Sequence, residues 1–130
     1  GCLAWLSGRK KVVAVEPRTS QAYNAALTAG APCDVTVAGV AADALGARQV
    51  GQLSFNLAQA YPDGLLERIL VEDEEIITAR QRLWDRCRLL VEPSGAAALA
   101  AVISGRYKPA QNEGLGIVVC GANCDPASLS

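Results

Sequence analysis

The stretch that decides the fold is residues 116–125, which read GIVVCGANCD. Its apolar run, residues 117–119, stops at Cys120 and Gly121. A short apolar run bounded by glycines is typical of a strand buried on both faces, as in a parallel sheet covered by helices. Ligands of open α/β sheets bind just beyond the carboxyl ends of such strands, and Cys120 has that position. These residues alone favour a buried cysteine before an ordinary turn and leave a ligand contact as the alternative.

Predicted strands and helices alternate along the rest of the chain. We expect further strands at residues 11–16, 34–37 and 68–71. We expect the end of a helix at residues 1–6 and helices at residues 20–30, 51–61, 74–90 and 95–103, with a loop at residues 39–48. This order predicts one α/β domain over residues 1–130, with a parallel sheet flanked by helices.

Details of the helices follow from capping residues and spacing. Ser20 is expected to cap the helix at residues 20–30, and Asp73 the helix at residues 74–90. Pro93 and Ser94 open a helix so rich in alanine that it must pack tightly. The apolar residues of the 74–90 helix fall on one predicted face: Ile76, Ile77, Leu83, Trp84, Cys87 and Leu90.

Composition excludes several classes of partner. The 130 residues are 51% hydrophobic, and 12 basic residues balance 13 acidic ones without a stripe of either sign. This balance argues against binding to nucleic acid or to a membrane surface. No apolar run approaches the roughly 20 residues that span a bilayer.

Five scattered cysteines and the absence of histidine argue against a disulfide framework and a zinc site. We therefore expect a reduced, cytoplasmic protein. The chain begins with Gly1 rather than Met, so we expect a fragment of a longer protein.

Two motifs carry a family resemblance: VEPSGAAALAA at residues 91–101, and VVCGANCD at residues 118–125. Together they resemble the closing third of the pyridoxal-phosphate enzymes that include threonine dehydratase, serine dehydratase and serine racemase, of fold type II (tryptophan synthase β-like). VVAVEP at residues 12–17, LTAGAP at residues 27–32 and the acid-led segment at residues 71–77 follow in the family's order. The resemblance covers essentially the whole chain but well under half of a typical member. It implies the C-terminal part of the family's cofactor-binding large domain.

The resemblance implies a cofactor-binding set of Cys120, Gly121, Asn123 and Glu92. The family residue at the place of Cys120 is a small neutral side chain that hydrogen-bonds the pyridine nitrogen of the cofactor, and such a partner does not force that nitrogen to stay protonated. Gly121 and Asn123 are expected to shape the same loop. The matching family glutamate faces the cofactor ring, but an acid stabilised by a helix N-terminus accounts for Glu92 equally well. Asp43 resembles an acidic loop residue near the family's active-site mouth, and a plain loop aspartate is as good an interpretation.

By the same resemblance, Glu16 matches a glutamate that helps to hold a divalent cation in some members. The aspartate that completes that site is replaced here by Ala22, with Ser20 at the position of a carbonyl ligand. A hard cation needs several oxygen ligands. We therefore predict no metal site and interpret Glu16 as a solvated strand end.

The family's catalytic lysine, which forms the Schiff base with the cofactor, has no counterpart in the chain. Lys10, Lys11 and Lys108 stand in polar, turn-like settings and none lies in a Ser-x-x-Lys context. The family's glycine-rich phosphate loop is also missing. We predict no catalytic residue in this chain, and no binding of pyridoxal 5′-phosphate by this chain alone.

Two functional hypotheses follow. The first is a fragment of a threonine or serine ammonia-lyase, which converts a hydroxy amino acid to a 2-oxo acid and ammonia; a serine racemase fragment is an alternative within the same family. The second is a non-catalytic α/β half-domain that associates with itself to cover exposed sheet edges. Expected partners are a small amino-acid substrate in the complete enzyme and a second copy of the chain.

Overall fold

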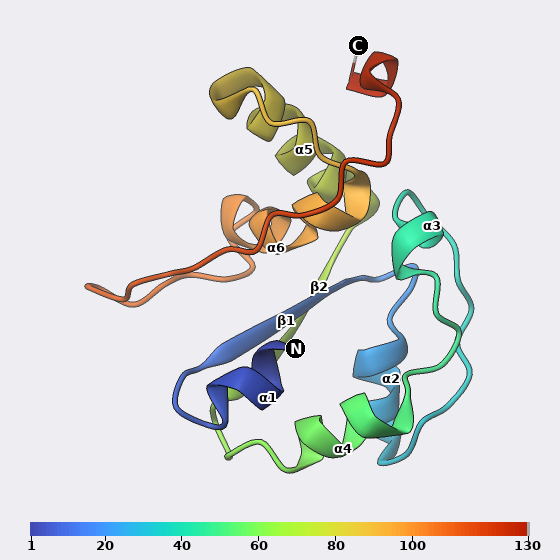
Figure 1. Cartoon of the computed structure of the whole chain (residues 1–130), viewed down its shortest axis with the longest axis vertical. Helices are drawn as coiled ribbons and strands as arrows, with labels where there is room; N and C mark the ends of the chain where they lie inside the picture. Colours follow the sequence, from blue (N-terminus) through green and yellow to red (C-terminus); the bar gives the residue numbers. More distant parts are fainter. Residues whose placement is uncertain (130) are drawn as a thin grey trace.

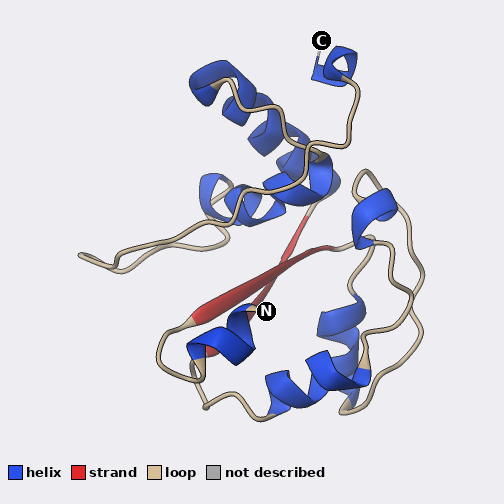
Figure 2. Cartoon of the chain, in the orientation of Figure 1, coloured by secondary structure: helices blue, strands red, loops and turns tan. Residues whose placement is uncertain are grey.

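The structure is a computed structural model and describes residues 1–129. Figures 1 and 2 show six helices, two strands and a final 3₁₀ turn in that part of the chain. In order they are α1 (Cys2–Leu6), β1 (Val12–Pro17), α2 (Ala22–Ala29), α3 (Ala42–Leu45), α4 (Gln52–Gln59), β2 (Leu66–Val71), α5 (Asp73–Cys87), α6 (Pro93–Ile103) and η1 (Pro126–Leu129). None of these helices has the length and apolar character that crossing a membrane requires.

The two strands pair in parallel, with Val12 opposite Leu66 and Pro17 opposite Val71. Helices α5 and α6 lie on one side of the strands, and α1, α2 and α4 lie on the other (Figure 1). A parallel pair needs such coverage because both of its faces are apolar. The predicted class, a parallel sheet flanked by helices, is confirmed.

The core lies where α5 and α6 meet the sheet. Four alanines of α6 are buried, and Ile76 and Leu83 of α5 pack with them. Alanine has no side chain beyond Cβ, so the two helices and the strands can approach closely. The tight packing predicted for the alanine-rich helix is confirmed; its buried alanines are Ala96, Ala97, Ala100 and Ala101.

The apolar face of α5 is narrower than the sequence predicted. Ile76, Ala79, Arg80 and Leu83 face the core, whereas Ile77 is 52% exposed. Ile77 lies one residue, or about 100°, around the helix from Ile76 and so points toward solvent. Cys87 is exposed as well. The predicted cap, Asp73, is also wrong, because Glu72 is the N-cap and forms a capping box with Glu75.

The predicted final strand, residues 117–119, is wrong. The segment is extended, but no residue of the described chain hydrogen-bonds its backbone, and Val118 is 63% exposed. The only strand that β1 pairs with in residues 1–129 is β2, so the segment has no neighbour to complete a ladder. β-branched residues keep the run extended, but extension alone does not make a sheet.

Three further expectations failed in the segment between β1 and α4. Residues 34–37 form no strand, and the predicted loop at residues 39–48 contains the short helix α3. Ser20 does not cap α2, whose N-cap is Gln21. The buried Ser20 hydroxyl instead donates to the carbonyl oxygen of Leu45, which fixes the end of α3 beside β1.

Glu16 is not a solvated strand end. Its carboxylate accepts hydrogen bonds from the backbone N–H groups of Tyr23 (2.9 Å) and Asn24 (2.8 Å) in the first turn of α2. These donors have no partner within the helix, so Glu16 serves as a cap supplied from a distant element. Burial raises the pKa of Glu16, while the two hydrogen bonds and the charge of Arg68 oppose that shift.

This arrangement predicts how substitutions of Glu16 affect stability. Glu16→Ala should lower the free energy of unfolding by about 1–2 kcal/mol near neutral pH, because the first turn of α2 loses both acceptors. Glu16→Gln keeps one acceptor and should lose less. Urea unfolding followed by circular dichroism measures both changes.

The pH dependence has a definite sign. A carboxyl whose pKa is raised by folding stabilises most below its unfolded value and loses that stabilisation as pH rises through its folded value. The stability of the native chain relative to Glu16→Gln should therefore fall as pH rises from below 4.5, the ordinary pKa of the carboxyl, toward neutrality. A rise over the same range would contradict the burial of this carboxylate.

Candidate functional site

The two motifs of the sequence meet at the N-terminus of α6. Gly95, in the first turn of that helix, lies directly against the backbone of Cys120. A Cβ atom at Gly95 would stand 1.5 Å from the Cys120 carbonyl oxygen, so no other residue fits without moving one backbone away from the other. The absence of a side chain at Gly95 therefore sets how closely the end of the apolar run approaches α6.

A second close contact joins Gly121 to Glu92. Gly121 has a φ of +75°, and a Cβ there would lie 2.4 Å from the carboxyl carbon of Glu92. The N–H of Glu92 donates to the Gly121 carbonyl (2.9 Å), and the N–H of Asn123 donates to Glu92 Oε2 (3.3 Å). The Ser94 hydroxyl donates to Glu92 Oε1. Glu92 thus holds the turn at residues 121–123 through both its backbone and its carboxylate.

A cavity of about 240 Å³ opens beside this contact. Glu92 and Asn123 line it from the two motifs, and Asp43 lines it from α3. The rest of its wall consists of Val40, Ala41, Ala44, Pro93, Ser94 and Cys124. Its volume falls below the roughly 300–1,000 Å³ typical of small-molecule pockets. The described residues therefore form one wall of a site rather than a complete pocket.

The structure brings the predicted residues together, with different exposures. Glu92 and Asn123 line the cavity, while Gly121 and Cys120 lie next to it in the chain without lining it. The Cys120 side chain is exposed, which overturns the interpretation of Cys120 as a buried core residue. Glu92 satisfies both interpretations offered for it, because it is the N-cap residue of α6 and also lines the cavity.

Arg80 is the structural residue that sequence reasoning missed. It is 8% exposed on the inner face of α5. Its guanidinium donates to the Val91 carbonyl (2.6 Å), to the Ser128 carbonyl (3.2 Å) and to the Ser128 hydroxyl (2.6 Å). It therefore ties together the residue before Glu92 and the segment that follows the cysteine motif. An arginine at helical spacing between Ile76 and Leu83, on an apolar face, was the available signal.

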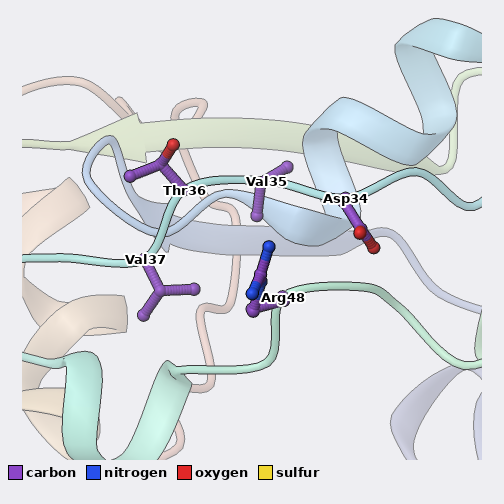
Figure 3. Close-up of a pocket in the computed structure, with 5 residues that line it drawn as sticks. All are labelled: Asp34, Val35, Thr36, Val37 and Arg48. Carbon is purple, nitrogen blue, oxygen red and sulfur yellow. The ribbon is translucent and has the colours of Figure 1, made fainter.

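A second, larger cavity lies apart from this site. It has a volume of about 410 Å³ and is lined by Arg48 and by residues 34–37 (Figure 3). Its two walls are loop segments joined by the Val35 N–H, which donates to the Arg48 carbonyl at 2.8 Å. None of the predicted site residues lines it, so cavity size alone does not locate the site.

Neither a metal cluster nor a lysine belongs to the site as described. Within residues 1–129 no group of three or more cysteine, aspartate or glutamate side chains is placed to hold a metal ion. Lys10, Lys11 and Lys108 do not line the cavity. Lys11 instead pairs with Glu67 at 2.7 Å.

Comparison with known proteins identifies the family. A family model described as pyridoxal-phosphate-dependent enzyme matches residues 2–121. The chain belongs to this family. It is 37% identical over 116 residues to the biosynthetic L-threonine dehydratase IlvA of Salmonella typhimurium, an alignment that covers 87% of the chain and 22% of that enzyme. It is 30% identical over 125 residues to phenylserine dehydratase of Ralstonia pickettii, covering 96% of the chain and 37% of that enzyme.

Solved structures of family members share the fold. A bacterial threonine deaminase, from T.th., superposes with a TM-score of 0.76 at 28% identity, covering 95% of this chain and 42% of that one. Maize serine racemase gives a TM-score of 0.78 at 28% identity, covering 92% and 36%. The chain thus spans well under half the length of these relatives.

The donor set at the cavity fits the ring end of pyridoxal phosphate better than its phosphate. The N-terminus of α6 would attract an anion, but the Glu92 carboxylate already lies there and would repel a phosphate group. A neutral thiol, an amide and backbone groups suit the polar atoms of a pyridine ring. The residues present therefore fit one end of the cofactor, and no phosphate cradle accompanies them at this cavity.

The contact between Gly121 and Glu92 can be separated from the backbone conformation of Gly121. Gly64 has the same φ of +75° but nothing within 4 Å of the place that a Cβ would occupy, so Gly64→Ala reports the conformational cost alone, about 1–2 kcal/mol. Gly121→Ala should lose about 1–3 kcal/mol more, because the added methyl group displaces Glu92. Urea unfolding of the two variants measures the difference. Equal losses would show that Glu92 yields without cost.

Proposed function

We propose that residues 1–130 form the C-terminal part of the cofactor-binding domain of an enzyme that eliminates the hydroxyl group of a β-hydroxy amino acid. The substrate is L-threonine or L-serine, and the products are a 2-oxo acid and ammonia. The observation that carries the proposal is the junction of the two motifs, where Gly95 and Gly121 allow Cys120, Glu92 and Asn123 to gather at one cavity. Relatives named threonine dehydratase and serine dehydratase-like support the reaction class.

The residues of this chain have distinct roles in the proposal. Pyridoxal phosphate, when bound, withdraws electrons from the substrate and so makes its α-proton acidic. Cys120 offers the ring nitrogen a neutral partner and leaves that nitrogen free of an enforced proton. Glu92 positions the turn that carries Cys120, and Ser94 orients the Glu92 carboxylate. Asn123 and Asp43 line the substrate side of the cavity and exclude water from it.

Substitution of Cys120 tests this role in the complete polypeptide that the gene encodes. Cys120→Ser keeps a small neutral partner and should retain activity. Cys120→Asp places a carboxylate against the ring nitrogen, holds a proton there, and should lower the rate by about 10²-fold. Cys87→Ser, on the exposed side of α5, is the matched control and should leave the rate unchanged.

The assay is the formation of a 2-oxo acid from L-threonine and from L-serine in the presence of pyridoxal phosphate. If Cys120→Asp is as active as the native enzyme, the assigned role of Cys120 is wrong. If neither substrate yields a 2-oxo acid while D-serine accumulates from L-serine, the enzyme is a racemase of the same family. If no product forms although the cofactor is bound, the enzymatic proposal fails.

We also propose that the protein self-associates and resides in a reducing compartment such as the cytoplasm. All five cysteines are free thiols, which supports the compartment. Trp5 on α1 and Leu53 on α4 are 79% and 74% exposed on neighbouring helices, which supports an apolar contact between copies. Sedimentation velocity should show a dimer that Trp5→Ser and Leu53→Ser together dissociate. A monomer at all concentrations would contradict self-association.

A further inference from the structure

Two strand edges face each other across the sheet with no strand between them. β1 pairs with β2 on one edge, and within residues 1–129 no strand occupies its other edge. Residues 115–119 are extended, apolar and without any backbone hydrogen bond to the described chain. Unpaired peptide groups beside apolar surface are unfavourable, because neither the sheet nor freely accessible water satisfies them.

An apolar cavity of about 270 Å³ separates these two edges. Val13 and Val15 of β1 form one wall, and Ile117 and Val118 form another. Ala98 and Ala101 of α6, together with Cys2 and Leu6 of α1, close the two faces. The cavity therefore has the four boundaries of a place in a helix-covered sheet: a strand edge on each side and a helix above and below.

The direction of the two edges is the same. In Figure 1, β1 and the orange-to-red segment that contains residues 115–120 run side by side toward the N-terminus of α6. Both contribute to the lining of one cavity, so the proximity is not an effect of the view. A strand placed between them would therefore meet donors and acceptors of parallel-sheet spacing on both of its edges.

We propose that this groove receives one extended apolar β-strand, which hydrogen-bonds to β1 on one edge and to residues 117–119 on the other. The strand belongs to the part of the dehydratase polypeptide that lies outside residues 1–129. The groove rests on the geometry alone, whereas the source of the strand rests on the proposed function. Relatives of the same fold contain more than twice the length that this chain spans, since it covers 42% of the threonine deaminase chain.

The chemistry of the groove favours a strand over other occupants. Its lining is almost entirely aliphatic, and Lys11 at one end is already paired with Glu67. A small polar ligand would find no charged partner there. The exposed residues proposed for self-association, Trp5 and Leu53, do not line it. Only a peptide backbone satisfies two facing rows of peptide groups.

The test is strand addition to this chain, followed by amide hydrogen exchange resolved by NMR. The probe is a short synthetic peptide of valine and isoleucine with a lysine at each end. Binding should slow exchange at Ile117, Val118 and Val119, and at the β1 amides that face away from β2, by about tenfold or more. Protection must occur on both walls, since the proposed strand bonds to both.

Two control peptides carry N-methyl groups on alternate residues, one on each set. Each blocks hydrogen bonding along one edge of the peptide, so both should bind far more weakly than the unmethylated peptide. A peptide that merely adds to one free edge would tolerate one of the two methylation patterns. Tolerance of either pattern would therefore overturn the two-sided groove.

A matched pair of chain variants completes the test. Val118→Pro removes a backbone donor within the groove and should abolish the protection. Gln111→Pro places proline at the second position of the turn formed by the Glu113 N–H and the Ala110 carbonyl, where proline is favoured, and should bind as the native chain does.

The remaining outcomes also decide the proposal. No protection by the unmethylated peptide overturns the groove, and so does protection that survives Val118→Pro. Protection of residues 117–119 without peptide, rising with protein concentration, would assign the groove to a second copy of the chain and likewise overturn the proposal. None of these readings uses catalysis, so the groove can fail while 2-oxo acid formation stands, and the reverse.

Discussion

The rest of the site depends on one steric constraint, the approach of two backbones at the N-terminus of α6. Gly95 leaves room for the carbonyl of Cys120, and Gly121 leaves room for the side chain of Glu92. The two glycines act on opposite partners, so each motif supplies the space that the other occupies. Asn123 reaches Glu92 only because both contacts are made. The family resemblance of the two motifs thus has a physical basis in this mutual fit.

Periodicity predicted most of the fold, and it failed where tertiary neighbours decide the outcome. The alanine-rich α6, the paired strands and the long α5 follow from local patterns. The apolar run at residues 117–119 has the strongest strand signal in the chain and forms no ladder. A pattern of β-branched residues reports what a segment can do, whereas pairing requires a second backbone in the right place. Sequence spacing cannot reveal whether that backbone is present.

The polar residues were less predictable than the apolar ones. Glu16, Ser20 and Arg80 each bond to an element far along the chain: Glu16 to α2, Ser20 to the end of α3, and Arg80 to the segments around Val91 and Ser128. Each bond satisfies a donor or acceptor that burial would otherwise leave unpaired. The family resemblance located Glu92, Cys120 and Asn123, but it could not show that Arg80 supports them from behind.

The segment that contains the cysteine motif is anchored at one end only. Beyond Cys120 its backbone is held by Gly95, Glu92 and, through Ser128, by Arg80. Before Cys120 nothing in residues 1–129 hydrogen-bonds it. A strand in the groove beside β1 would fix the free half and thereby restrict the position of Cys120 as well, since the two halves are continuous backbone. Completion of the sheet and completion of the cofactor site are then one event, because the ladder that the sheet lacks is also the support that the cysteine lacks.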